Sequence, residues 1–354
     1  MPVSIIGNSG IQFPDSSLQA AAASPYVLKN RIINGDMRID QRNAGASVST
    51  ASGSSAYTLD RWQIIYDATS KFTLQQNAGS VTPPVGFSNY LGITSSSAYT
   101  VTSSQLFIVR QHIEGFNTAD LDFGTANAKT VTLSFWVRSS LTGTFGGSIC
   151  NSAQNRFYPF SYTISSANTW EQKTVTIAGD TTGTWVGATN GIGLQVIFGF
   201  GVGSSLSASA GAWTASNGFS ATGATSVVGT NGATFYITGV QLEQNTSATP
   251  FERRLYNQEL ANCQRYFEIL TNDATNGFSL LSGTLLAPSS HWSNWIFKQT
   301  KRASPTVALA TGNSWTAVTP SIFPSTSNVL FSGTNYFYNS GAANTTGLTA
   351  SVEL

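Results

Sequence analysis

The chain has 354 residues, of which 41% are hydrophobic and only 9% charged, and its formal net charge is +1. Its 21 Phe, 12 Tyr and 8 Trp supply a packed core, which excludes global disorder, and the length is enough for two domains. The near-neutral charge excludes the broad basic surface that nucleic-acid binding requires, and so neutral a surface, weakly protected by charge repulsion, favours an oligomer.

Residues 1–25 are predicted to form an N-terminal arm and linker. The segment 10–19 alternates apolar and polar residues, which predicts a strand added to a neighbouring sheet, with a disordered tail as the alternative. The small-residue run 20–24 before a proline indicates a linker. Residues 1–7 lack the basic start and apolar stretch of a signal peptide, and no run of about 18 apolar residues occurs, so neither classical secretion nor membrane insertion is expected.

From residue 26 to about 248, short strand-like segments follow one another, separated by Gly, Asn and Ser. The segment 131–138 places four apolar side chains on one face and Thr, Ser, Trp and Arg on the other, which is the two-residue period of a half-buried strand. The same alternation recurs at 106–111, 174–178, 192–200 and 235–242. Many short strands with such breaks predict a β-sandwich.

One helix is predicted over 249–268. Thr249 and Glu252 have the spacing of a capping box, and Pro250 suits the first helical position. Glu259 is expected on the polar face of this helix. The apolar face is predicted to consist of Tyr256, Leu260, Cys263 and Phe267.

After the helix the pattern returns to strands, which predicts a small C-terminal β head domain over 269–354. Its strand-like segments are 278–286, 295–298, 307–310 and 336–338. The expected fold class is therefore all-β: a jelly-roll β-sandwich over 26–248, a linking helix and the C-terminal β domain. No internal repeat or heptad run is found, which excludes a coiled-coil shaft.

Several segments, in this order along the chain, resemble bacteriophage tail fibres and receptor-binding proteins: 28–42, 57–62, 238–243, 248–254 and 263–267. The segment 10–19 is also similar to N-terminal pieces of phage tail proteins, and 301–307 resembles the C-terminal head of such fibres. The resemblance implies a homotrimeric virion protein, made in the host cytoplasm and acting outside the cell. Its partners would be other tail or baseplate proteins and the host's surface polysaccharide or lipopolysaccharide.

A second set of segments looks like the jelly-roll carbohydrate-binding modules: 34–37, 111–115, 133–138, 168–171 and 235–240. This resemblance implies a glycan-facing sandwich over roughly 30–243. Many such modules hold calcium partly through an acidic residue of the last strand, where this chain has Gly239. Asp36 and Glu243 are the remaining candidate ligands, with solvated surface acids as the alternative, and no metal or cofactor is predicted.

Sugar recognition needs flat apolar rings that stack on pyranose C–H groups and planar polar side chains that bind hydroxyls. Packing in a core or a subunit interface is the alternative for each candidate, and it is the prediction for Trp62 and Trp170. The carbohydrate-binding candidates are Trp136, Arg138, Tyr158, Trp185 and Trp213 in the sandwich, and Trp292, Trp295, Trp315 and Tyr336 in the C-terminal domain.

No catalytic residue and no structural zinc site are predicted. Cys150 and Cys263 form no metal-binding pattern and are expected to be free, buried thiols. His112 and His291 lie outside hydrolase and protease motifs, which favours structural roles. The carboxylates that a glycosidase would need are available at Glu114, Asp120, Asp122, Asp36 and Asp40.

The sequence thus predicts a non-enzymatic, glycan-binding tail-fibre protein. An architectural virion protein, such as a capsid decoration or baseplate component, is the second hypothesis. A tailspike polysaccharide depolymerase is the third.

Overall fold

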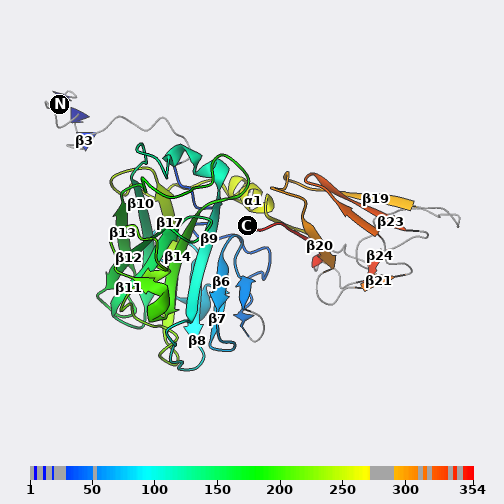
Figure 1. Cartoon of the computed structure of the whole chain (residues 1–354). Helices are drawn as coiled ribbons and strands as arrows, with labels where there is room; N and C mark the ends of the chain where they lie inside the picture. The colour runs from blue at the N-terminus through cyan, green and yellow to red at the C-terminus, as the bar shows by residue number, and fades with distance from the viewer. Residues whose placement is uncertain are drawn as a thin grey trace.

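The computed structural model describes residues 4–5, 11–12, 18–19, 29–50, 54–271, 291–309, 314–316, 321–333, 338–340 and 346–354. This part of the chain is almost entirely β, with a single α-helix between a sandwich and a smaller β region (Figure 1). The predicted fold class is confirmed. The boundaries of the predicted domains remain predictions.

Two six-stranded antiparallel sheets form the sandwich. The first sheet has the order β13-β10-β17-β8-β7-β4. Its strands are β4 (Val48–Ser49), β7 (Phe72–Gln76), β8 (Leu91–Ser95), β10 (Val131–Ser139), β13 (Glu171–Ile177) and β17 (Thr234–Glu243). The second sheet has the order β12-β11-β14-β9-β6-β5. Its strands are β5 (Ser55–Tyr57), β6 (Gln63–Tyr66), β9 (Leu106–Glu114), β11 (Gly143–Cys150), β12 (Phe157–Ile164) and β14 (Ile192–Val202).

The main core lies between these two sheets. The apolar face predicted for β10 is confirmed, because Val131, Leu133, Phe135 and Val137 are all fully buried, but Thr132 and Ser134 of the opposite face are buried as well. The ring of Phe135 meets that of Phe198 from β14 edge to face, with centroids 5.0 Å apart. Burial of each such side chain stabilises the fold by about 1.5–3 kcal/mol. Apolar contact between the inner faces therefore holds the sandwich together.

A second apolar cluster lies on the outer face of the second sheet. It is covered by the segment with η5 (Ser204–Leu206), β15 (Ser207–Ala208) and β16 (Ser220–Ala221). Phe157 of β12 packs edge to face on Phe219, with centroids 4.9 Å apart. Phe157 also exchanges backbone hydrogen bonds of 2.9 and 2.8 Å with Thr214. These contacts fix the loop between β15 and β16 beside the start of β12.

The helix is shorter than predicted. α1 spans Tyr256–Gln264 and begins without a side-chain cap, and Phe267 already starts strand β18 (Phe267–Thr271). The predicted capping box is wrong, because tertiary hydrogen bonds occupy its residues. The Glu252 carboxylate accepts the backbone N–H groups of Lys29 and Asn30, each at 2.7 Å.

Two further residues of this segment also differ from their predicted positions. Tyr256 is 54% exposed, and Glu259, expected on a polar face, is 3% exposed. The Glu259 carboxylate accepts the backbone N–H of Asn34 and pairs with Arg254 at 3.2 Å. A buried acid that ties the helix to the sandwich is the reason for the reversal, since a buried charge needs such partners.

The C-terminal β region consists of small sheets. One has the order β18-β25-β20, with β20 (Thr306–Leu309) and β25 (Thr346–Ser351). Another has the order β19-β23-β22, with β19 (His291–Ile296), β22 (Ser321–Pro324) and β23 (Asn328–Gly333). β21 (Ser314–Thr316) pairs with β24 (Tyr338–Ser340). The predicted strand at 278–286 lies outside the described residues.

The N-terminal strands β1 (Ser4–Ile5), β2 (Ile11–Gln12) and β3 (Leu18–Gln19) pair with one another in a small sheet, and the addition of a strand to a neighbour remains a prediction. Both cysteines are free and buried, as predicted. In the described part of the chain, no helix has the length and apolar character needed to cross a membrane.

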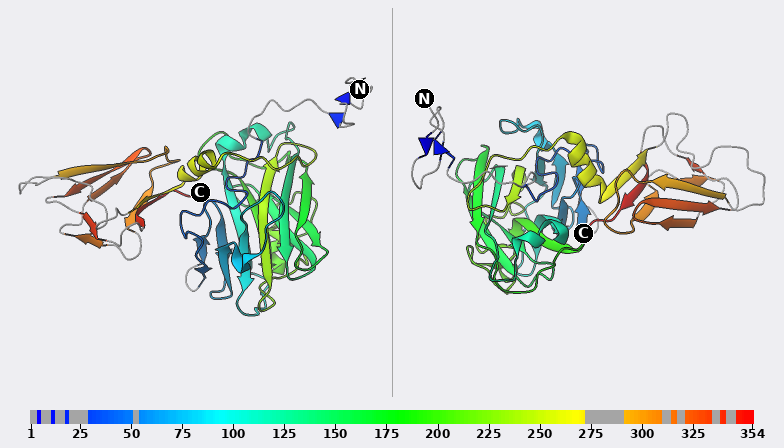
Figure 2. Two further views of the ribbon diagram at one scale, coloured as in Figure 1. Left: turned by 180° about the vertical axis from the view of Figure 1, so that it is seen from behind. Right: turned by 90° about the horizontal axis from the view of Figure 1, so that it is seen from above.

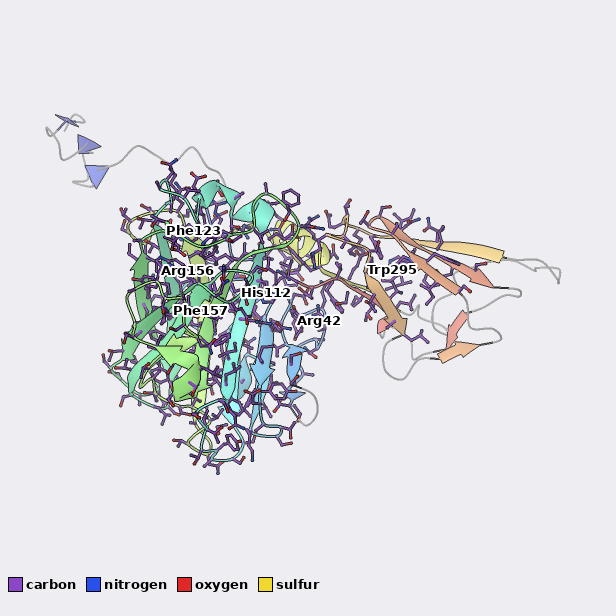
Figure 3. All side chains as sticks on the ribbon, viewed as in Figure 1. Arg42, His112, Phe123, Arg156, Phe157 and Trp295 are labelled. Atoms are coloured by element: carbon purple, nitrogen blue, oxygen red, sulfur yellow. The ribbon has the colours of Figure 1, made fainter. Side chains whose placement is uncertain are left out.

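Ion pairs join the sandwich to the C-terminal region, which lies to one side of it (Figure 2). Arg265 forms a two-pronged pair with Glu114 of β9, both contacts being 2.9 Å. The Glu353 carboxylate accepts hydrogen bonds from Arg61 and, at 2.7 Å, from Arg42, which Figure 3 labels. Because bidentate guanidinium–carboxylate pairs fix orientation, these contacts set how the two parts sit together.

Candidate functional site

Three of the predicted sugar-binding residues meet in space. Tyr158, Trp185 and Trp213 pack with Phe123, and we call these four residues the aromatic cluster. Their ring centroids lie 4.9 Å (Phe123–Trp185), 5.5 Å (Trp185–Trp213), 5.8 Å (Phe123–Trp213) and 5.4 Å (Tyr158–Trp213) apart, all edge to face. All four residues are half-buried, and they pack against the edge of the main core.

The four rings come from separate stretches of the chain. Phe123 follows the short helices η3 (Gly115–Asn117) and η4 (Ala119–Leu121), and Tyr158 belongs to β12. Trp213 lies in the loop that the Phe157–Thr214 bridge fixes. Gly124 has a φ of 84°, and a Cβ there would lie 3.0 Å from the Trp185 ring. Glycine at this position therefore lets the indole pack against the Phe123 loop.

Internal hydrogen bonds already engage both indole N–H groups. Trp213 donates to the carbonyl of Ala178 at 2.7 Å, and Trp185 donates to the carbonyl of Thr182 at 3.2 Å. The rings are thus held in fixed orientations, and contact with a ligand would use ring faces and edges.

Beside the cluster, Arg156 is held by a two-pronged ion pair with Asp180, in which both contacts are 2.7 Å (Figure 3 labels Arg156 and Phe123). Burial would raise the pKa of Asp180, but hydrogen bonds from Arg156 and Thr182 lower it below its usual value. Within the described residues, the second terminal nitrogen of Arg156 has no partner. The cluster therefore has a fixed polar donor close by, as sugar hydroxyls require.

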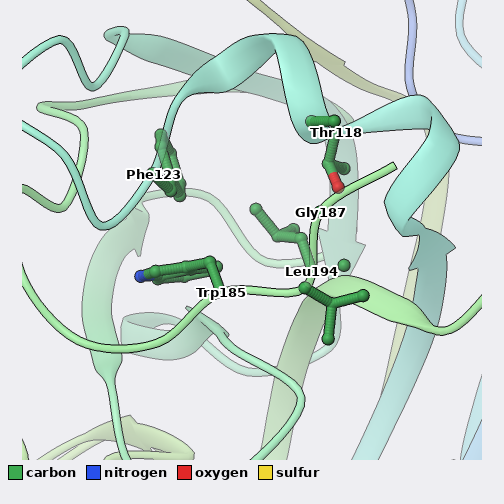
Figure 4. A pocket seen from close by; sticks show the side chains of 8 residues that line it. Thr118, Phe123, Trp185, Gly187 and Leu194 are labelled. Atoms are coloured by element: carbon green, nitrogen blue, oxygen red, sulfur yellow. The ribbon is translucent and has the colours of Figure 1, made fainter. Parts of the chain in front are cut away.

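A small pocket opens next to Phe123 and Trp185 (Figure 4). Its volume is about 60 Å³, and its other lining residues include Thr118, Gly187 and Leu194. Since liquid water takes about 30 Å³ per molecule, the pocket has room for about two water molecules. Enclosed ligand pockets usually measure at least about 300 Å³. The cluster is therefore an open surface with a small recess.

Trp136 and Arg138 lie elsewhere, on the outer face of the first sheet. Gly239, with a φ of 62°, sits under Trp136, and a Cβ there would lie 2.6 Å from the Phe87 ring. The Arg138 guanidinium lies 5.5 Å above the Tyr236 ring and donates to the carbonyl of Asn168 at 2.9 Å. The structure thus separates these two candidates from the aromatic cluster.

Two predictions for tryptophans are wrong. Trp295 is 6% exposed and packs on Phe297 in the C-terminal core, with ring centroids 5.1 Å apart, because β19 turns it inward. Trp170, expected in the core, is half-buried on the outer face of the first sheet beside Tyr90. Trp62 is fully buried, as predicted. The side chains of Trp292 and Trp315, and all of Tyr336, lie outside the described residues.

The candidate carboxylates are engaged in internal contacts. Four of them pair with cations, and Asp40 accepts backbone N–H groups of its own turn. The pairs are Glu114–Arg265, Asp120–Arg31, Asp122–Lys129 and Asp36–Arg38. No two of these acids are left facing each other without a cation among the described residues.

Glu243 is 2% exposed and accepts hydrogen bonds from Thr249 and Gln241, so it is not the solvated surface acid considered above. Within the described residues, no group of three or more His, Cys, Asp or Glu side chains could hold a metal ion. His112 is buried between the carbonyl of Leu354 and the Gln195 amide. Burial, together with Arg110, lowers its pKa to about 3, which fits the structural role predicted for it.

The described residues thus define an all-β protein whose sandwich presents a half-exposed aromatic cluster. No protein-family model and no curated protein sequence matches the chain. Matches among solved structures include the enzymatically active domain of tailspike protein 4 of bacteriophage CBA120, at 14% identity over 56% of this chain and 21% of that chain, with a TM-score of 0.30.

Two carbohydrate-binding modules also match. One is TmCBM61 in complex with β-1,4-galactotriose, at 9% identity over 62% of this chain and 100% of that chain, with a TM-score of 0.31. The other is the family 11 module of Clostridium thermocellum in complex with a β-1,3-1,4-mixed-linked tetrasaccharide, at 11% identity over 57% of this chain and 96% of that chain, with a TM-score of 0.28. TM-scores of this size are too low to transfer function or site residues.

Proposed function

We propose that the chain is a bacteriophage tail-fibre protein that binds a host surface glycan, without catalysis, through the aromatic cluster. The observation that carries this proposal is the meeting of Tyr158, Trp185 and Trp213, from distant parts of the sequence, at one half-exposed surface. Half-buried aromatic residues beside a fixed guanidinium suit the C–H faces and hydroxyls of a sugar.

The motif order along the sequence supports the virion part of this proposal. In it, residues 1–25 attach the protein to tail or baseplate proteins, and the assembled protein is a homotrimer. Linked copies raise the effective concentration of each further contact, so weak sites suffice for attachment to a cell. A monomeric mass by light scattering across micromolar concentrations would refute the trimer.

Two other functions make different predictions. In an architectural virion protein, the aromatic cluster would be covered by a neighbouring subunit, so no glycan would bind. A depolymerase would release reducing sugar from host polysaccharide, for which it needs a free pair of carboxylates. The cation pairing of Glu114, Asp120, Asp122 and Asp36 supports binding without hydrolysis.

The test is binding of the purified full chain to candidate host cells and to their extracted surface polysaccharide. Trp213→Ala should weaken binding at least about tenfold, because it removes a ring in contact with three others. Tyr256→Ala, which removes an exposed ring of α1, is the matched control and should bind like the wild type.

Each outcome separates the candidates. Loss of binding in a folded Trp213→Ala protein supports the aromatic cluster. Loss in Trp292→Ala alone would move the site to the C-terminal region and refute the cluster. No binding by a correctly assembled wild type, to any plausible host, would favour the architectural function, and release of reducing sugar would favour the depolymerase.

A further inference from the structure

The loop that carries η3 and η4 lines a second cavity. Asn117 faces this cavity, whereas the next two residues, Thr118 and Ala119, line the small pocket beside Trp185. The second cavity measures about 150 Å³, and we call it the polar pocket. Its lining residues are Asn30, Arg31, Ile33, Asn117, Arg254 and Asn262.

The walls of the polar pocket are held in place by internal hydrogen bonds. The Asn30 side chain donates to the carbonyl of Val240 at 3.2 Å and accepts the backbone N–H groups of Ile32 and Leu242. Arg254, whose side chain is 8% exposed, donates to the carbonyl of Ile32 at 3.0 Å. The pocket is therefore pre-formed, and a ligand would pay little to order it.

Both arginines of the pocket are paired with carboxylates. Asp120 pairs with the guanidinium of Arg31, and Glu259 pairs with that of Arg254 at 3.2 Å. Because each cation already has a carboxylate, the pocket has no surplus positive charge to attract an anion. Its lining is polar and includes these two paired arginines, with Ile33 as the one apolar side chain.

Unused hydrogen-bonding groups remain at the pocket. Within the described residues, the Asn117 side chain has no hydrogen bond, and the Asn262 side chain has only a long contact of 3.5 Å to Glu259. The Nε atom of Arg31 is buried without a hydrogen-bond partner. Each amide offers both donors and an acceptor, which is the combination that a pair of adjacent hydroxyl groups satisfies.

We infer that the polar pocket binds one neutral pyranose unit, held by the amides of Asn117 and Asn262. At about 150 Å³ the cavity has half the volume usual for an enclosed ligand pocket, so part of one six-membered ring would enter it and the remaining substituents would project through the open side. Charge balance excludes a preference for acidic sugars, and a polar lining excludes an apolar ligand.

The inference extends the proposed function but uses different residues. Asn117 and Thr118 are consecutive, with Cα atoms about 3.8 Å apart, so the polar pocket and the pocket beside Trp185 border one loop. A glycan on the aromatic cluster could place another unit in the polar pocket. Both sites then hold the same glycan molecule, and binding at each site raises the effective concentration of the glycan at the other.

The test uses ligand-observed NMR with the full chain and the methyl glycosides of glucose, galactose, mannose and N-acetylglucosamine, one at a time. At least one should bind with a dissociation constant in the millimolar range, as expected for about a dozen heavy atoms. Asn117→Ala combined with Asn262→Ala should weaken this binding at least tenfold. Asn127→Ala, at an exposed asparagine of the following loop, is the matched control and should change nothing.

The outcomes are separable from those of the proposed function. Binding of a methyl glycoside that persists in Trp213→Ala but is lost in the double variant supports the polar pocket, whatever the polysaccharide assay shows. Binding that survives in the double variant, or no binding of any of the four glycosides at 100 mM (on the order of a hundred times the expected constant), overturns the inference. Stronger binding of sodium glucuronate than of methyl glucoside would also overturn it.

Discussion

Asp60 should make the stability of the sandwich fall as the pH rises from about 4 to 7. The residue is fully buried, and its carboxylate accepts hydrogen bonds from the backbone N–H and the side chain of Gln41. Burial raises its pKa from 3.8 to about 7, although Gln41 and Arg42 oppose the shift. Between these values the folded protein holds a proton that the unfolded chain has lost.

The direction and size of the change in the free energy of unfolding with pH follow from this difference in bound protons. Where the folded state binds one more proton than the unfolded state, the free energy of unfolding decreases with pH by about 1.4 kcal/mol per unit. Over the interval from 3.8 to about 7, the loss reaches about 4 kcal/mol and then levels off. Asp60→Asn mimics the neutral carboxyl and removes this loss.

The assay is urea denaturation of wild type and Asp60→Asn at half-unit steps from pH 4 to 8. The free-energy difference between the two proteins should shift in favour of the variant by a few kcal/mol and become constant above about pH 7. Asp67→Asn, at an exposed aspartate, is the control, and its difference should not follow this trend. A difference for Asp60→Asn that is independent of pH would refute the reasoning.

Two other substitutions test the packing, and a third tests the ion pair beside the aromatic cluster. Phe135→Ala should lower the free energy of unfolding by about 3–5 kcal/mol, since it leaves a cavity in the main core; a loss below about 1 kcal/mol in denaturation would contradict this. Gly239→Ala should lower the melting temperature, because its Cβ would lie 2.6 Å from the Phe87 ring and φ is 62°; an unchanged melting temperature would show that this site tolerates a side chain. Asp180→Asn should release Arg156 and weaken glycan binding while the core stays intact, which near-ultraviolet circular dichroism and the polysaccharide assay measure together; unchanged affinity would mean that Arg156 need not be fixed.

The strands were predictable because one physical rule decides them. In β10, successive side chains point alternately to the core and to the outer face of the sheet. Only one assignment of residues to these faces buries all four apolar side chains, and the sequence shows which one. The same rule misled at β19. Alternation fixes which residues share a face, but not which face meets the core, and Trp295 lies on the inner one.

The helix shows where local signals fail. Thr249 and Glu252 have capping-box spacing, and in isolation they would stabilise a helix start by about 1 kcal/mol. In the folded chain, Glu252 instead accepts two backbone N–H groups from residues more than two hundred positions away. Charge-assisted bonds to a carboxylate outweigh a cap, and the sequence carries no local sign of them.

The aromatic cluster was predictable in its residue types but not in its long-range contacts. Tyr158, Trp185 and Trp213 could be chosen from the sequence by residue type, because sugar stacking requires such rings. Their meeting depends on long-range pairing, namely the Phe157–Thr214 bridge and the Arg156–Asp180 ion pair, which bring separate loops to one surface. Nothing in the sequence pointed to Phe123 as a member of the cluster. It contacts two indoles because the η3–η4 loop folds over them. The η3–η4 loop also borders the polar pocket. Its position therefore affects both the aromatic cluster and the polar pocket, and a change in this loop should alter the two sites together.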